Sequence, residues 1–214
     1  MDLQHLFPPD VALVVADEPM WHTPLRDAEE ALIDGAIEKR QREFRAGRHA
    51  AHAALIKLQA PELPLLRGER REPIWPSGYL GSITHCRDLC VAVCAREDRL
   101  AGLGIDVEPL EPLPKGVDRY INTEEEARFV AANPGVHPER LIFSAKESLY
   151  KCYYPLVKRF FGFQSVALTL DLARQRYTFT PTPSSSISFP AFRFEGRFVI
   201  GSNHLLTACH LLRV

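Results

Sequence analysis

The chain lacks a long apolar run, a marked excess of either charge, and a cysteine pattern typical of a metal site. Its 214 residues include 26 Lys and Arg against 27 Asp and Glu, so the net charge is -1. This balance provides no overall basic field, and we expect neither nucleic acid nor a membrane as a partner. No apolar run is long enough to cross a bilayer, and the first residues do not resemble a secretion signal. We therefore expect a cytoplasmic protein.

Cysteines are few and odd in number, with five in the chain. In a chain large enough to fold on its own core, this count favours reduced thiols over a disulfide framework. Cys90 and Cys94 lie in the apolar run 89–95, which predicts small buried strand residues. The paired Cys and His spacing of zinc sites is missing, so we do not expect zinc.

Prolines suggest a division of the chain into two halves. Pro109, Pro112 and Pro114 follow one another closely, which predicts an N-terminal half over 1–109 and a C-terminal half over 110–214. Periodicity and turn residues predict helices over 25–36, 38–58 and 138–153, a helix capped by Thr123, strands over 81–84, 89–95, 101–107, 165–170, 176–180, 192–194 and 205–212, and a loop over 181–188. Each half is then helices with a small antiparallel sheet, an α+β fold. With both halves in one chain, we expect a monomer.

Two acidic residues occupy alternate positions of the predicted strand at 104–108. Because strand side chains alternate between faces, Asp106 and Glu108 should point the same way. Neighbouring carboxylates repel unless a cation lies between them, and oxygen ligands at this spacing suit Mg²⁺. The alternative is an exposed strand end with two solvated acids.

A second acidic segment, 143–151, places Glu147 and Lys151 one helical turn apart. A surface ion pair is the ordinary explanation for such spacing, worth a few tenths of a kcal/mol. The pair gains chemical interest only if this helix faces Asp106 and Glu108.

Basic residues gather in the first half. Arg40, Phe44 and Arg48 recur at four-residue steps and should share one side of their helix. Arg67, Arg70 and Arg71 follow in a loop rich in Gly and Pro, and His85 follows a predicted strand. Guanidinium groups suit phosphate through bidentate contacts. The alternatives are a solvated Arg-rich surface and a structural histidine.

Together, five segments in this order resemble the phosphopantetheinyl transferases of the surfactin and enterobactin synthetase-activating type, most closely the bacterial enterobactin-type branch. The segments are 38–48, 71–76, 81–86, 104–108 and 143–151. The resemblance implies that the phosphopantetheine arm of coenzyme A moves to a serine of an acyl or peptidyl carrier protein, releasing adenosine 3′,5′-bisphosphate. It also implies two similar α/β halves about a pseudo-two-fold axis, with the active site between them.

The resemblance carries roles over to individual residues. It implies that Asp106, Glu108 and Glu147 hold Mg²⁺, that Asp106 and Lys151 also contact coenzyme A and act in catalysis, and that Glu147 serves as general base. Around the nucleotide it implies contacts from Arg40, Arg48, Arg67, Arg70, Thr84 and His85. Phe143 and Thr84 depart from the commonest residues of the family, Trp and Ser, but keep an apolar residue and a hydroxyl.

Two other functions stay open from the residues. A metal-dependent phosphodiesterase or nuclease could use the same acids, although Pro109 and Leu110 follow Glu108 where such enzymes often supply a lysine. A non-catalytic nucleotide-binding module would leave the acids as surface charges. For the carrier protein, which is usually acidic around its serine, residues 158–161 (Lys-Arg-Phe-Phe) are a candidate surface. Burial of the two phenylalanines in the core is the alternative.

Overall fold

The computed structural model describes residue 3 and residues 5–135, 137–183, 185, 189–190 and 192–213. Over these residues the chain is an α+β fold with two antiparallel sheets, of strand order β1-β3-β2 and β4-β8-β7-β6-β5. Each sheet packs against one 20-residue helix, α3 or α6. The predicted plan of two halves, each with helices and an antiparallel sheet, is confirmed.

The elements follow the chain in an order close to the predicted one. They are β1 (Ala12–Val15), α1 (Glu18–His22), α2 (Asp27–Glu30), η1 (Ala31–Ile33), α3 (Glu38–Lys57), β2 (Tyr79–Cys86), β3 (Leu89–Arg96), β4 (Leu100–Pro109), α4 (Asp118–Ile121), α5 (Glu124–Ala132), α6 (Pro138–Val157), η2 (Phe163–Ser165), β5 (Val166–Asp171), β6 (Arg176–Pro181), β7 (Arg193–Ile200) and β8 (His204–Leu212). As expected, Thr123 caps α5, and it forms a reciprocal capping box with Glu126.

Three predictions of local structure differ from the observed elements or extend beyond the described residues. The helix expected over 25–36 is broken into α2 and the 3-10 helix η1, and the chain leaves it at Gly35, whose φ of +70° a right-handed helix cannot contain. Strand β7 is longer than the expected 192–194, and β1 and α1 were not predicted. The loop expected over 181–188 begins inside β6, and residues 184 and 186–188 lie outside the described residues.

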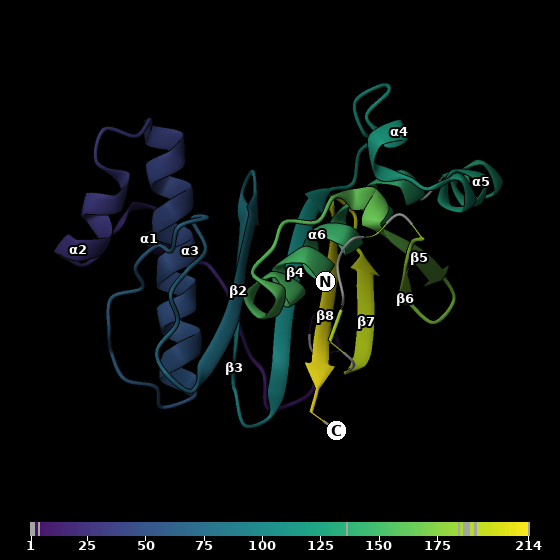
Figure 1. The fold of residues 1–214 in the computed structure, drawn as a ribbon. Helices are drawn as coiled ribbons and strands as arrows, with labels where there is room; N and C mark the ends of the chain where they lie inside the picture. Colours follow the sequence, from purple (N-terminus) through teal and green to yellow (C-terminus); the bar gives the residue numbers. More distant parts are fainter. Residues whose placement is uncertain are drawn as a thin grey trace.

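The two long helices lie on either side of the junction between the sheets. Helix α3 packs on the sheet of β1, β2 and β3, whereas α6 lies across β4 and β8 (Figure 1). Strand β2 packs beside β4 at the junction. Apolar residues fill the space under each helix, and a third cluster joins β3, β4 and β8 to Leu6 and Phe7. The junction of β2, β4 and α6 is therefore framed by rigid elements.

Strand β4 brings α6 close to its own backbone. Leu103, Ile105 and Val107 face the core of the sheets and are at most 3% exposed. The alternate positions face α6, and a Cβ at Gly104 would collide with the carbonyl oxygen of Ser148 in α6. Glycine thus permits the close approach that brings the α6 side chains to the acidic end of β4.

The predicted boundary after residue 109 would place β4 in the first half. By hydrogen bonding β4 belongs to the second sheet, since it pairs with β8 from Leu100 to Pro109. By packing it also meets β2 of the first half. Strand β4 therefore joins the two halves, and the division at 109 and 110 stays a prediction.

In the described part of the chain, no helix combines the length and apolarity that a membrane crossing requires.

Candidate active site

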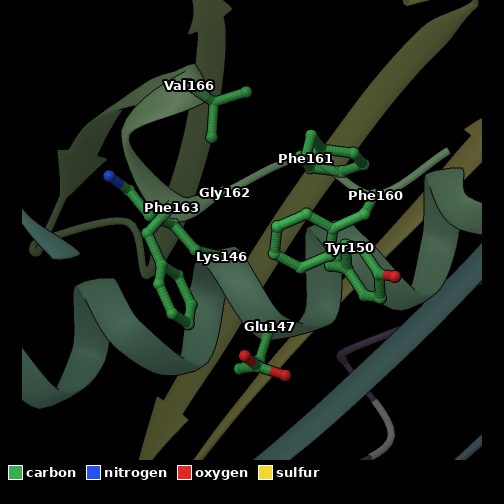
Figure 2. A pocket seen from close by; sticks show the side chains of 8 residues that line it. All are labelled: Lys146, Glu147, Tyr150, Phe160, Phe161, Gly162, Phe163 and Val166. Atoms are coloured by element: carbon green, nitrogen blue, oxygen red, sulfur yellow. The ribbon is translucent and has the colours of Figure 1, made fainter. Parts of the chain in front are cut away.

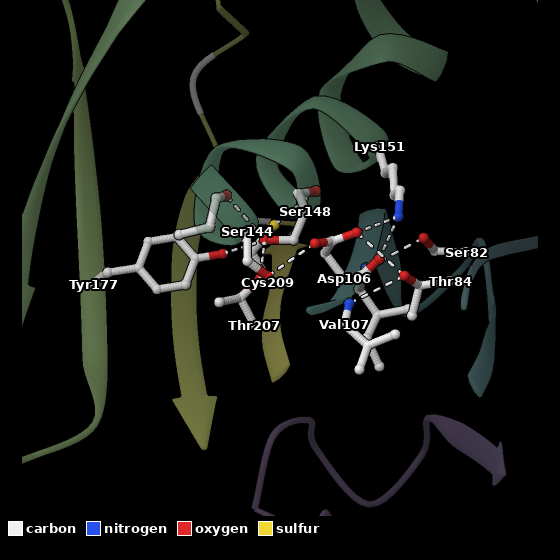
Figure 3. A network of polar contacts seen from close by, with 12 residues as sticks. Ser82, Thr84, Asp106, Val107, Ser144, Ser148, Lys151, Tyr177, Thr207 and Cys209 are labelled. Atoms are coloured by element: carbon white, nitrogen blue, oxygen red, sulfur yellow. Dashed lines mark hydrogen bonds and ion pairs between the residues drawn. The ribbon is translucent and has the colours of Figure 1, made fainter. Parts of the chain in front are cut away.

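Asp106 is the centre of a buried hydrogen-bond network that joins β2, β4 and α6 (Figure 3). Its carboxylate, in a residue only 5% exposed, accepts hydrogen bonds from Thr84 Oγ1 at 3.1 Å, Ser144 Oγ at 2.8 Å and Lys151 Nζ at 2.7 Å. Thr84 comes from the first half, and Ser144 and Lys151 come from α6. The network thus connects segments from both halves through one carboxylate.

The partner of Lys151 decides between the two interpretations of the second acidic segment. Lys151 Nζ bonds to Asp106 and to the carbonyl oxygen of Ile105 at 3.1 Å, across from α6 to β4. The Glu147 carboxylate makes no hydrogen bond or ion pair with any of the residues described. The interpretation of Glu147 and Lys151 as an ordinary surface ion pair is therefore wrong. The side of α6 that carries them faces β4, the strand of Asp106 and Glu108.

The three carboxylates share one electrostatic field. Burial raises the pKa of Glu147, and the negative charge of Asp106 raises it further, while Lys151 opposes both effects. Burial likewise raises the pKa of Glu108, as does the charge of Asp106, and Arg140 opposes them. Mutual repulsion of this kind is relieved by a nearby cation. However, the described residues contain no group of three or more His, Cys, Asp or Glu arranged to hold a metal ion. The magnesium site therefore stays a prediction.

Arg140 is a site residue that the sequence reasoning missed. Its Nη1 lies 2.7 Å from Glu108 Oε2, and its other nitrogens donate to the carbonyl oxygens of Glu111 and Pro112 at 3.0 and 2.8 Å. Arg140 thereby links Glu108 to the proline-rich connection that follows β4. The signal was present: positions 140, 144, 147 and 151 recur at helical spacing on one face of α6.

Arg40 and Arg48 both lie near one aromatic ring on α3. The guanidinium carbons of Arg40 and Arg48 are 5.9 and 4.5 Å from the centre of the Phe44 ring, as the four-residue spacing predicted. Arg48 is 4% exposed, and its Nε donates to the carbonyl oxygen of Leu65 at 2.9 Å. Burial lowers the pKa of Arg48 to about 10, so it remains charged at neutral pH. The geometry places two cations on a rigid ring.

His85 and Thr84 point to opposite faces of β2. His85 faces α3, where its Nε2 is 3.5 Å from Arg40 Nη1 and its Nδ1 is 3.9 Å from a carboxylate oxygen of Glu43. Thr84 faces β4, where its hydroxyl donates to Asp106 and accepts from the Val107 amide at 3.0 Å. Burial lowers the pKa of His85, against the opposing charge of Glu43. The structure therefore brings His85 to the arginines and Thr84 to the acidic centre.

The Arg-rich loop reaches the second half. Arg67 and Arg70 are exposed, and a backbone bridge between Arg67 and Pro73 closes the loop. The charge of Arg70 is close enough to Tyr150 of α6 to oppose the rise that burial causes in the tyrosine pKa. The loop thus carries exposed cations beside the helix of Glu147 and Lys151.

An apolar cavity of about 140 Å³ adjoins Glu147 (Figure 2). Its walls are Lys146, Glu147, Tyr150, Phe160, Phe161, Gly162, Phe163 and Val166. The ammonium of Lys146 is bound elsewhere, to Glu126 at 2.7 Å and to the carbonyl oxygen of Ile121 at 2.8 Å. Phe161 is 6% exposed and Phe160 is 69% exposed. Of the two alternatives, burial in the core holds for Phe161, and a place on the surface holds for Phe160.

Two family models match most of the chain. The 4′-phosphopantetheinyl transferase N-terminal domain matches residues 28–95, and the 4′-phosphopantetheinyl transferase superfamily matches residues 102–209. The matched segments together contain every predicted site residue.

Curated relatives agree with these matches. The 4′-phosphopantetheinyl transferase Npt of Nocardia iowensis is 36% identical over 192 residues, covering 85% of this chain and 86% of the relative. The 4′-phosphopantetheinyl transferase PptT of Mycobacterium tuberculosis is 40% identical over 156 residues, covering 72% and 68%. Enterobactin synthase component D of Salmonella typhi is 34% identical over 144 residues, covering 64% and 58%. The chain belongs to the 4′-phosphopantetheinyl transferase superfamily and is an enzyme of the transferase class.

Proposed function

We propose that this enzyme transfers the 4′-phosphopantetheine arm of coenzyme A to a serine of an acyl or peptidyl carrier protein, with Mg²⁺, and releases adenosine 3′,5′-bisphosphate. The observation that carries the proposal is the 2.7 Å pair between Asp106 of β4 and Lys151 of α6, joined to β2 through Thr84. It places a carboxylate and an ammonium at the junction of the two halves, beside the guanidinium groups of α3. Phosphoryl transfer depends on such charge placement, because positioning and electrostatic stabilisation supply most of its rate.

The nucleotide end of coenzyme A carries a 3′-phosphate, for which Arg40, Arg48 and His85 form the proposed site. Arg48 offers terminal guanidinium nitrogens that make no hydrogen bond within the described residues, while its Nε is fixed by Leu65. Guanidinium groups bind phosphate oxygens in a bidentate manner. Arg67 and Arg70, exposed in the neighbouring loop, add cations that can contact the rest of the nucleotide.

The pyrophosphate end belongs to the acidic centre. The raised pKa values of Glu108 and Glu147, both partly caused by Asp106, fit a set of oxygen donors that a divalent cation would stabilise. Asp106, Glu108 and Glu147 would hold Mg²⁺. When bound there, the ion would neutralise charge on the pyrophosphate and orient it.

Glu147 and Lys151 have separate roles in the proposed transfer. The serine Oγ of the carrier forms a bond to the phosphorus that bears the pantetheine arm, and the bond from that phosphorus to the bridging oxygen breaks. Glu147, free of any described partner, takes the serine proton. Lys151 stabilises the charge that develops on the departing adenosine 3′,5′-bisphosphate. The electron pair of the broken bond remains on that leaving group.

The pantetheine arm and the carrier meet the enzyme beside Glu147. The arm is long and largely uncharged, and the apolar cavity of Tyr150, Phe161 and Phe163 adjoins the proposed base. Exposed Phe160 lies at the edge of this cavity and follows Lys158 and Arg159, both exposed. An apolar residue next to two cations suits a carrier surface that is acidic around its serine. Arg159 is exposed and does not line the cavity, so Arg159→Ala should raise the KM for the carrier and leave the KM for coenzyme A unchanged.

One assay tests the function against its alternatives. The protein is incubated with coenzyme A, Mg²⁺ and an apo carrier protein, and the intact carrier is weighed by mass spectrometry. A gain equal to one phosphopantetheine group is expected. Hydrolysed coenzyme A with an unmodified carrier would instead indicate a phosphodiesterase, and bound but intact coenzyme A would indicate a binding module.

A further inference from the structure

Glu29 is a fully buried carboxylate outside the site described so far. It lies on α2 with 0% exposure, and its Oε1 is 2.8 Å from His52 Nε2 on α3. The same oxygen accepts a hydrogen bond from the Leu65 amide at 3.0 Å. The other oxygen, Oε2, is buried and has no hydrogen-bond partner. Burying a carboxylate is costly, and an apolar residue could dock α2 on α3 without that cost.

The backbone of Leu65 links this carboxylate to Arg48. The Leu65 N–H donates to Glu29, and the Leu65 carbonyl oxygen, which belongs to the next peptide group, accepts the hydrogen bond from Arg48 Nε at 2.9 Å. Leu65 is itself 0% exposed, so this stretch of backbone is packed in the interior. Glu29 therefore anchors the backbone directly beside the carbonyl group that holds the Arg48 guanidinium by its Nε.

The charge state of Glu29 supports the same arrangement. Burial alone would raise the pKa of Glu29, but the hydrogen bonds from His52 and Leu65, together with the charge of Arg48, outweigh it. The net pKa is lowered, so the carboxylate is ionised at neutral pH. It can then only accept hydrogen bonds, and the Leu65 amide must point toward it.

We infer that Glu29 and His52 are positioning residues that hold Arg48, through the backbone of Leu65, in the orientation that selects coenzyme A over 3′-dephospho-coenzyme A. The inference rests on the proposed function, in which Arg48 binds the 3′-phosphate. Residues that orient metal ligands change affinity or activity by about 10- to 100-fold when replaced, and we expect the lower end of that range for residues that orient an arginine.

The experiment compares Glu29→Leu with Glu30→Leu, because glutamine would keep an oxygen in place of Oε1, which accepts both hydrogen bonds of Glu29. Glu30 is the adjacent carboxylate and also docks α2 on α3, through Arg45 at 2.8 and 2.9 Å, but it touches neither Leu65 nor Arg48. For Glu29→Leu, the KM for coenzyme A should rise about tenfold. The KM for 3′-dephospho-coenzyme A and the kcat with either substrate should stay as in the wild type. Glu30→Leu should leave the ratio of the two KM values unchanged, which separates positioning from general destabilisation.

The Arg48→Ala variant separates failure of this inference from failure of the proposed function. If Arg48→Ala loses the preference for coenzyme A and Glu29→Leu keeps it, the positioning role is overturned while the 3′-phosphate site stands. If Arg48→Ala weakens both substrates equally, Arg48 does not bind the 3′-phosphate and both proposals fail. Should Glu29→Leu not fold, His52→Ala takes its place, because His52 is partly exposed and alanine removes its contact with Glu29 Oε1. Its KM ratio must then shift in the same direction, and an unchanged ratio would refute the inference.

Discussion

Ser144 should support catalysis through Asp106, whereas Ser148, one turn later on the same helix, should not. Both serines are 0% exposed. Ser144 Oγ donates to Asp106 Oδ2 at 2.8 Å and lies 2.9 Å from Thr207 Oγ1. Ser148 Oγ donates to the carbonyl oxygen of Ala145 at 2.9 Å, lies 2.8 Å from the hydroxyl of Tyr177 and accepts from Thr207 Oγ1 at 3.2 Å. Ser144 thus bonds directly to the carboxylate, whereas Ser148 is connected to it only through Thr207 and Ser144.

The expected magnitudes differ because only one acceptor is charged. Ser144→Ala removes a buried hydrogen bond to a carboxylate, which costs about 1.5–3 kcal/mol of unfolding free energy. Ser148→Ala removes bonds between neutral groups, which costs about 0.5–1.5 kcal/mol. With one donor lost, Asp106 is less well oriented, and we expect kcat/KM to fall about 10- to 100-fold in Ser144→Ala. Ser148→Ala should keep its activity within about twofold, since none of its bonds is made to the carboxylate itself.

Urea unfolding measures the first quantity, and initial rates of carrier modification measure the second at a temperature where both variants are folded. If Ser148→Ala lost as much activity as Ser144→Ala, the effect would be a general loosening of α6. If Ser144→Ala kept wild-type activity, the role assigned to the Asp106 network would be wrong.

Three further predictions concern stability. Lys146→Met leaves the buried carboxylate of Glu126 without its cation, and thermal or urea unfolding should show a loss of about 3–5 kcal/mol; an unchanged midpoint would contradict this. Gly104→Ala should lower both the unfolding free energy, by about 1–3 kcal/mol, and the transfer rate, because the new methyl group pushes α6 away from β4; wild-type values of both would refute the close approach. The hydrogen bonds from Arg45 lower the pKa of Glu30 from 4.5 to about 2, so their stabilisation is present above pH 4.5 and is lost as the pH falls toward 2. Glu30→Gln should therefore be less stable than wild type by about 1 kcal/mol at pH 7, and urea titrations should show that gap closing between about pH 4.5 and 2; a constant gap would argue against it.

Local sequence signals predicted the elements that carry the site. Periodic apolar residues and flanking prolines located α3 and α6, and alternation in β4 correctly separated Ile105 and Val107 from Asp106. Strand β1 escaped prediction because it is four residues long and becomes a strand only by pairing with β3, which lies far along the chain. Short elements of this kind depend on tertiary contacts that no local pattern reveals.

The partners of the site residues were harder to predict than the residues themselves. Spacing alone assigned Lys151 to Glu147, whereas the fold gives it to Asp106, 45 positions away. The pairing of Arg140 with Glu108 spans 32 positions and depends on how the connection after β4 returns to α6. These ion pairs form because α6 packs on β4, and neither segment taken alone indicates that contact.

The central claim is that the acidic centre at the junction of β2, β4 and α6 performs the transfer. Its most direct test is the intact mass of an apo carrier protein after incubation with coenzyme A, Mg²⁺ and either the wild type or Asp106→Ala. Circular dichroism would establish that the variant is folded. The account predicts addition of one phosphopantetheine group by the wild type and no addition by Asp106→Ala over the same time. Transfer by folded Asp106→Ala at the wild-type rate would contradict it.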